Sequence, residues 1–126
     1  DIVAAEDCTV MFLNGKTLLN TCDNGCKFHH TLVRNLLGIV AQNNMYLNQK
    51  IKYTSRKTTR EKLMTYLNDQ AKMKGSNDFT IPFNRQELAD YLGVERSAMS
   101  AELGKLTKLG ILRTQRSHFT LLKPLD

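Results

Sequence analysis

Residues 84–113 constrain this chain more than any other stretch, because they predict two short helices joined by a tight turn and followed by a strand. Asn84 and Glu87 stand three residues apart, which is the spacing of a capping box at a helix start. Gly93 can adopt the positive φ that a sharp turn requires. We therefore expect a first helix that begins near Arg85 and ends at Gly93.

The second helix of this pair has one apolar and one polar face. The apolar residues are spaced four and three apart and are Met99, Leu103 and Leu106. The opposite face is small and basic and carries Arg96, Ser97, Ser100, Ala101, Gly104, Lys105 and Lys108. Small side chains let a helix lie deep in a groove, hydroxyls hydrogen-bond base edges, and lysines contact phosphates. This face therefore suits the DNA major groove, although paired short helices also occur in plain helical bundles.

A hairpin is predicted directly after the second helix. Residues 111–114 and 118–122 alternate apolar and polar side chains, with Arg116 in the turn between them. A hairpin in this place is a wing, and Arg116 would lie at its tip. An ordinary sheet edge with a solvated arginine is the alternative. Residues 79–81 predict a further short strand that can pair with the hairpin in a small antiparallel sheet.

Residues 58–122 resemble the DNA-binding domain of the Crp/Fnr family of bacterial transcription regulators. The resemblance is carried by TTREKLMTYLNDQA, FTIPFNRQELADYLGVERSAMSAELGKLTKLGIL and HFTLL. It implies a winged helix-turn-helix fold that binds double-stranded DNA. The family often has glutamate at the position of Ser97 and arginine at that of Ala101, both reading bases, whereas Ser100 matches the usual serine. The resemblance thus implies that the second helix binds in the DNA major groove. It does not imply the half-site sequence that is usual for the family.

The upstream part of the chain also fits this family. DIVAAEDCTVMFL resembles the last strands of the family's effector-sensing, cyclic nucleotide-binding-like β-roll. Val3, Val10 and Phe12 predict a strand there, and residues 16–22 a short helix. We therefore expect residues 1–25 to be the remnant of a β-roll, residues 26–54 a long dimerisation helix, and residues 55–126 the winged helix-turn-helix domain, with a hinge at residues 55–57. The fold class is mainly α with a small antiparallel sheet.

A long helical pattern over residues 26–54 contains a coiled-coil seam with a broadened apolar face. Such a helix exposes more apolar surface than this chain can cover. A second copy is the simplest cover, which predicts a homodimer; the domain expected to precede the helix is the alternative. The predicted interface comprises Leu32, Val33, Leu36, Leu37, Ile39, Val40, Asn43, Asn44, Leu47 and Ile51.

The charge of the chain is unevenly distributed. Residues 1–49 carry three basic and four acidic side chains, and residues 50–126 carry fifteen and eight, so the basic half is the helix-turn-helix half. Nucleic acid is the expected acidic partner, because lysine and arginine release counterions from phosphates. Three cysteines indicate a reducing compartment rather than a disulfide scaffold. No apolar run approaches the roughly 20 residues that span a bilayer, so we expect a cytoplasmic protein without a membrane partner.

Other chemistry has weaker support in the sequence. Cys22, Cys26, His29 and His30 contain thiols and imidazoles that could bind zinc, but Asp23 begins a helix-breaking run and no CxxC or HxxxH pair is present. A dimerisation or metal/redox-sensing module with incidental DNA affinity is therefore the alternative function, and packing at the helix start is the alternative for these side chains. No phosphate loop, G-x-S-x-G or H-E-x-x-H motif occurs, so we expect no enzyme, no metal and no cofactor in this fragment.

The function predicted from the sequence is that of a dimeric, sequence-specific transcription regulator that binds a palindromic operator. An effector of unknown identity, sensed by the preceding β-roll, would control DNA binding, and RNA polymerase is a further candidate partner. We assign Arg96, Ser97 and Ser100 to base edges and Lys105, Lys108 and Arg116 to phosphates. The full set of expected DNA contacts is Arg85, Arg96, Ser97, Ser100, Ala101, Lys105, Lys108 and Arg116.

Overall fold

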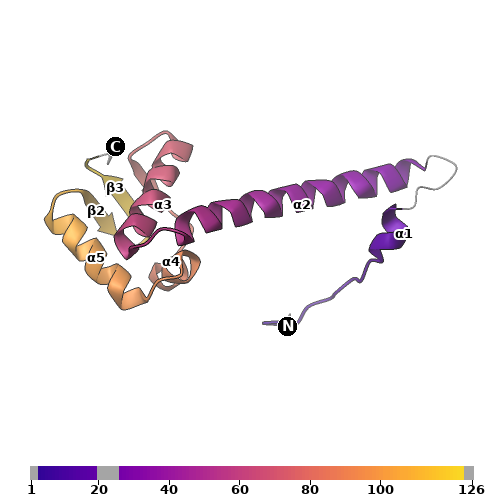
Figure 1. Ribbon diagram of the computed structural model, residues 1–126, viewed down its shortest axis with the longest axis horizontal. Coiled ribbons are helices and arrows are strands. Elements are labelled where there is room, and N and C mark those ends of the chain that lie inside the picture. Colours follow the sequence, from indigo (N-terminus) through magenta and orange to yellow (C-terminus); the bar gives the residue numbers. More distant parts are fainter. Residues whose placement is uncertain (1–2, 20–25, 124–126) are drawn as a thin grey trace. The chain divides into compact units, whose positions relative to one another are not determined.

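A computed structural model describes residues 3–19 and 26–123 of the chain (Figure 1). The chain divides into two compact units, Asp1–Asn44 and Met45–Asp126. In chain order the elements are α1 (Gly15–Leu19), α2 (Lys27–Thr54), α3 (Thr59–Lys74), β1 (Asp78–Thr80), α4 (Arg85–Leu92), α5 (Arg96–Lys108), β2 (Leu112–Gln115) and β3 (His118–Leu121).

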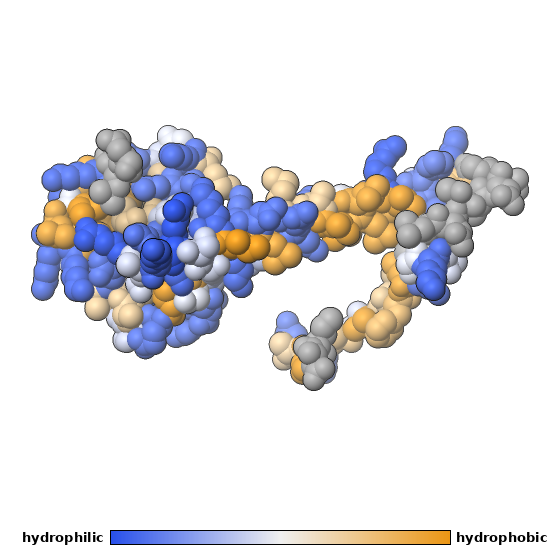
Figure 2. Space-filling model, viewed as in Figure 1, coloured by the Kyte–Doolittle hydropathy of each residue, from blue (hydrophilic) through white to orange (hydrophobic). Residues whose placement is uncertain are grey.

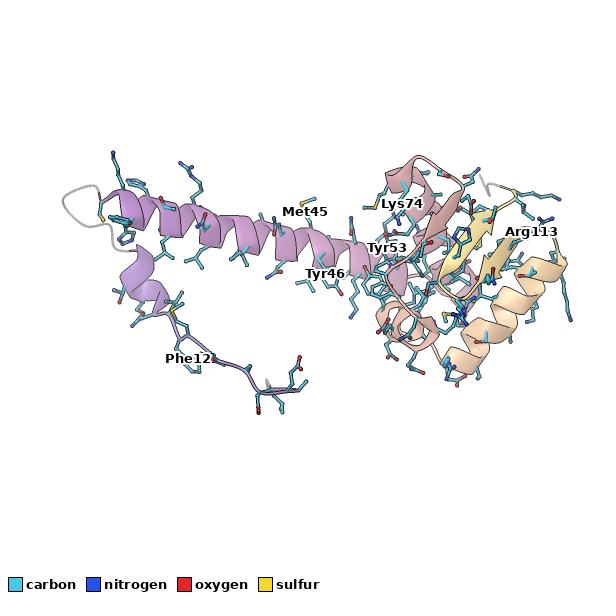
Figure 3. The ribbon with its side chains drawn as sticks, turned by 180° about the vertical axis from the view of Figure 1, so that it is seen from behind. Phe12, Met45, Tyr46, Tyr53, Lys74 and Arg113 are labelled. Carbon is cyan, nitrogen blue, oxygen red and sulfur yellow. The ribbon has the colours of Figure 1, made fainter. Side chains whose placement is uncertain are left out.

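Residues 3–14 form no strand, so the strand predicted at the start of the chain is wrong. A strand needs hydrogen bonds from a neighbouring strand. The three strands within the described residues pair only with one another. Phe12 is accordingly 94% exposed (Figure 3). The short helix expected at residues 16–22 is observed as α1, and residues 20–22 lie outside the described residues.

Helix α2 is a single helix of 28 residues, close to the predicted range. At about 1.5 Å per residue it is roughly 42 Å long. Most of its apolar side chains remain open to solvent in the single chain, and Figure 2 shows this apolar surface along the helix. Exposed fractions lie between 54% and 65% for Leu37, Ile39, Val40, Leu47 and Ile51.

The second unit contains the hydrophobic core. Its sheet has the order β1-β3-β2 and is antiparallel, with Phe79 opposite Phe119 and Leu112 opposite Leu121. The predicted pairing of the short strand with the hairpin is therefore confirmed. Helices α3, α4 and α5 contribute apolar side chains to the same core, and α5 buries the apolar side that the sequence predicts. The side chains that are fully buried include Leu63, Leu67, Leu88, Leu92, Met99, Leu106, Leu112 and Phe119.

The last turns of α2 pack into this second unit through aromatic rings. Tyr53 is 2% exposed and meets Tyr66 edge-on, with ring centroids 5.4 Å apart, and it lies 6.1 Å from the ring of Tyr91 (Figure 3). Beside it, Lys52 Nζ lies 2.5 Å from Asp69 Oδ2 on α3. The compact unit therefore begins inside α2, ahead of the polar segment at residues 55–57.

Candidate nucleic-acid interface

The turn between α4 and α5 has the geometry predicted from the sequence. The Asn84 side chain accepts from the Glu87 backbone N–H at 3.0 Å, and the Glu87 carboxylate accepts from the Asn84 N–H at 2.7 Å. Gly93 ends α4 in the left-handed conformation, with φ 60°. Val94 then packs partly buried against the core. These local features fix the start, the end and the exit direction of the first helix of the motif.

Helix α5 presents the expected polar surface. Met99, Leu103 and Leu106 are at most 4% exposed and anchor the helix on the core. The residues predicted to meet DNA on this helix are all exposed, and they are Arg96, Ser97, Ser100, Ala101, Lys105 and Lys108. The fold therefore holds these side chains on the solvent side of a helix whose other side is fixed.

Two acidic residues modify this surface, Glu102 within α5 and Glu95 directly before it. Glu102 is 15% exposed, lies 3.4 Å from Lys105 Nζ and 3.8 Å from Arg60 Nε on α3, and so ties α5 to α3. Lys105 keeps 69% of its side chain exposed and can still reach a phosphate. Glu95 caps the start of α5 and accepts from the Ala98 backbone N–H. The same carboxylate also accepts a hydrogen bond from the Ser97 hydroxyl, a contact for which the sequence carried no signal.

Strands β2 and β3 form the predicted wing. Arg116 occupies the turn between them, exposed and with φ 53°, a left-handed conformation that non-glycine residues adopt in tight turns. The turn is held to the body of the unit by two hydrogen bonds. Ser117 Oγ donates to the Phe83 carbonyl at 2.8 Å, and the Ile81 N–H donates to the Ser117 carbonyl at 3.0 Å.

Arg85 lies half-buried between α4 and the wing. Its Nη2 donates to Thr114 Oγ1 on β2 at 2.6 Å, and its guanidinium lies 5.1 Å from the ring centre of Phe119 on β3. Burial lowers the pKa of Arg85 from its ordinary value. Its other terminal nitrogen, Nη1, is buried and has no protein partner within the described part of the chain. The sequence named Arg85 as a DNA contact but carried no signal for this contact with the wing.

An open concavity of about 510 Å³ joins the starts of both helices to the wing turn. It is lined by Asn84, Arg85, Gln86, Arg96, Arg116 and Ser117. Three arginines that are separated in sequence thus line one hollow, and an oxyanion is the complementary ligand. The structure brings Arg85, Arg96 and Arg116 together here, while Lys105 and Lys108 stand further along α5.

The alternative metal site lies at the start of α2. Cys26 is partly exposed, and Cys22 lies outside the described residues. Across residues 3–19 and 26–123, no group of three or more His, Cys, Asp or Glu side chains could hold a metal ion. Within the same ranges, no helix is long and apolar enough to cross a membrane.

The features of the second unit define a winged helix-turn-helix domain. It consists of two capped helices joined at Gly93, of which the second has an exposed polar face, and a hairpin that follows them. Residues 61–125, more than half of the chain, match the family described as the Crp-like helix-turn-helix domain. The chain belongs to this family of helix-turn-helix domains. A comparison with curated proteins finds no match in sequence.

Solved structures resemble the chain in fold. A protein described as a transcriptional regulator of the Crp/Fnr family from Eubacterium rectale shares 16% identity and a TM-score of 0.50, over 80% of this chain and 44% of that one. The reduced CO-sensing protein from R. rubrum shares 18% identity and a TM-score of 0.40, over 80% of this chain and 49% of that one. The chain therefore spans less than half the length of either protein.

Proposed function

We propose that this chain is the C-terminal part of a dimeric transcription regulator that binds a palindromic operator under the control of an effector. The observation that carries the proposal is the exposed face of α5, which is small and basic and stands beside the wing arginine Arg116. A helix of this composition fits the major groove, and an adjacent wing reaches the neighbouring backbone.

Base reading is assigned to the first two turns of α5. Arg96 is the arginine of this helix that can bind guanine O6 and N7 through two hydrogen bonds, and Ser97 and Ser100 hydrogen-bond base edges. Ala101 is small enough to allow close approach or to contact a thymine methyl group. The remaining basic side chains, Lys105 and Lys108, contact phosphates.

The concavity lined by Arg85, Arg96 and Arg116 supports a phosphate position at the edge of the groove. Among residues 3–19 and 26–123, Nη1 of Arg85 is a buried donor without a hydrogen-bond partner, and such a group costs free energy unless a ligand satisfies it. Nη2 is already fixed by Thr114, so the guanidinium is held in place before DNA arrives. A phosphodiester oxygen would complete its hydrogen bonding.

Dimerisation is assigned to α2. The seam predicted from the sequence includes Leu37, Val40, Leu47 and Ile51, and more than half of each of these side chains is exposed in the single chain. A second copy of α2 covers such a surface in a coiled coil, with Asn43 and Asn44 fixing register. The two recognition helices would then meet half-sites about 34–36 Å apart.

Effector control is assigned to a change in dimer geometry. The last turns of α2 are packed on α3 and α4 through Tyr53, Tyr66 and Tyr91, so a displacement of that end of the helix carries the DNA-binding helices with it. An effector bound upstream would shift the population between two spacings of the recognition helices.

Binding of this chain to a randomised duplex pool over a salt series tests the proposal, with sequencing of the retained DNA. We expect a palindromic consensus and an affinity that falls steeply with salt, because six to ten phosphate contacts lose about 10³- to 10⁵-fold between 50 and 200 mM salt. Retention of DNA without a consensus at any salt concentration would contradict sequence-specific regulation.

A further inference from the structure

Glu95 immediately precedes α5 and is its N-cap residue. One carboxylate oxygen, Oε2, accepts a hydrogen bond from the Ala98 backbone N–H at 3.1 Å and another from the Ser97 hydroxyl. The hydrogen bond from Ser97, followed by those from the backbone, holds the pKa of Glu95 below its ordinary value. An exposed carboxylate anion therefore stands at the leading end of the recognition helix.

Helix capping alone does not account for glutamate at this position. Asn, Asp, Ser and Thr are the preferred N-cap residues, because their short side chains reach the first turn most directly. Within the part of the chain that the structure describes, Glu95 forms no ion pair with a basic side chain. A carboxylate also repels phosphates. On a surface that meets DNA, the second carboxylate oxygen of Glu95 therefore suits a DNA group that donates a hydrogen bond.

The contact between Ser97 and Glu95 determines what both side chains can offer. A serine hydroxyl has one proton, and Ser97 donates it to Glu95. The lone pairs of Ser97 Oγ and the second oxygen of Glu95 are then left as acceptors. In the major groove, guanine and thymine present acceptors, adenine presents an amino group beside the acceptor N7, and cytosine presents its N4 amino group without a neighbouring acceptor.

We propose that Glu95 and Ser97 together read the N4 amino group of a cytosine in each half-site. This inference rests on the proposed function and assigns part of its sequence preference. Arg96 lies between these two residues and is the donor that suits guanine, so the start of α5 carries complementary groups for both bases of G·C pairs. The carboxylate also disfavours guanine and thymine at its own position, since acceptor would face acceptor.

Glu95→Gln tests this assignment without removing the cap, because the amide oxygen can still accept from the Ala98 N–H. Coincident thermal unfolding curves for the variant and the wild-type chain establish that the fold is retained. Both proteins then select from the same randomised duplex pool. We expect wild-type protein to require cytosine at one position of each half-site. Glu95→Gln should weaken that preference by roughly tenfold and favour adenine, whose N6 and N7 pair with glutamine.

Ser97→Ala should weaken the same cytosine preference, and neither variant should change the slope of affinity against salt. If Glu95→Gln keeps the cytosine preference and binds every duplex more tightly with a steeper salt dependence, the carboxylate acts on phosphates and the inference is wrong. An unchanged sequence profile also overturns it. A wild-type protein that selects no consensus overturns the proposed function itself, which distinguishes that failure from failure of the Glu95 assignment alone.

Discussion

Arg85 Nη2 donates to Thr114 Oγ1 at 2.6 Å, and this contact joins the first turn of α4 to strand β2 of the wing across 29 residues of sequence. The same guanidinium packs over Phe119, and its Nη1 has no hydrogen-bond partner among the residues that the structure describes. One side chain thus ties α4 to the wing through Nη2, and the phosphate contact that we propose would use Nη1. The two roles can be separated by experiment.

Arg85→Met should remove both roles, whereas Thr114→Val should remove only the tie to the wing. Because each phosphate contact adds about 0.9 to the slope of log affinity against log salt, Arg85→Met should lower that slope by about 0.9. Thr114→Val should leave the slope unchanged and lower the free energy of unfolding by about 1 kcal/mol through the lost hydrogen bond. Fluorescence anisotropy over a salt series and urea unfolding measure these effects. Equal slopes for both variants would contradict the phosphate contact of Arg85.

Gly93→Ala should destabilise the domain although space is available for the new methyl group. A Cβ at this position would lie 3.8 Å from Thr54 Cγ2, which is an ordinary contact, but φ is 60°. The left-handed conformation costs an L-residue about 1–2 kcal/mol. Gly93→Asn is the matched control, because asparagine tolerates this conformation better. Urea unfolding should rank wild type, Asn and Ala in decreasing stability, and equal stabilities for Asn and Ala would contradict the backbone explanation.

Stability should fall at high pH because of the buried tyrosines. Burial, followed by the charge of Asp69, raises the pKa of Tyr53 above its ordinary value, and burial likewise raises the pKa of Tyr66. A raised folded-state pKa leaves stability intact below the ordinary tyrosine pKa of about 10 and reduces it as pH rises further.

Tyr53→Phe should therefore flatten the alkaline loss of stability, because phenylalanine has no hydroxyl group to ionise. Tyr46→Phe, at a position that is 49% exposed, is the control. Urea unfolding between pH 8 and pH 11 gives the comparison. An alkaline decline that is identical in wild type and Tyr53→Phe would mean that other groups cause it.

Val40→Lys should weaken dimerisation, because Val40 belongs to the predicted seam of α2 and is 62% exposed in the single chain. A lysine there places a charge in an apolar interface between two copies. Gln42→Lys adds the same charge on the opposite side of the helix and should leave the dimer intact. Sedimentation equilibrium of both variants and wild type tests this. A wild-type chain that stays monomeric at tens of micromolar would contradict the coiled-coil assignment.

The helix-turn-helix could be predicted because its signals are local. Asn84 and Glu87 cap α4, Gly93 ends it, and the spacing of Met99 and Leu103 marks the buried side of α5; each depends on neighbours within one or two turns. The wing hairpin was predicted for the same reason. The strand at the start of the chain was predicted wrongly, because alternation supplies a pattern but not a partner for hydrogen bonding.

The grouping of side chains at the site could not be predicted in this way. Arg85 contacts Thr114 only because the fold places the wing against α4. The distance between the wing and α4 cannot be predicted from the spacing of residues in the sequence. The concavity that collects Arg85, Arg96 and Arg116 depends on the same placement of the wing. The contact between Ser97 and Glu95 is local. Helical periodicity in the sequence nevertheless does not predict which acceptor binds the proton of a serine hydroxyl.

The division of α5 into base-reading and phosphate-binding residues is tested most directly by comparing the DNA selected by Arg96→Ala and Lys105→Ala with that selected by wild type. Arg96→Ala should lose guanine preference at one position of each half-site, with about 1–3 kcal/mol less discrimination. Lys105→Ala should bind all sequences more weakly and keep the consensus. An intact consensus in Arg96→Ala together with an altered one in Lys105→Ala would contradict the assignment of α5 as the element that reads the operator.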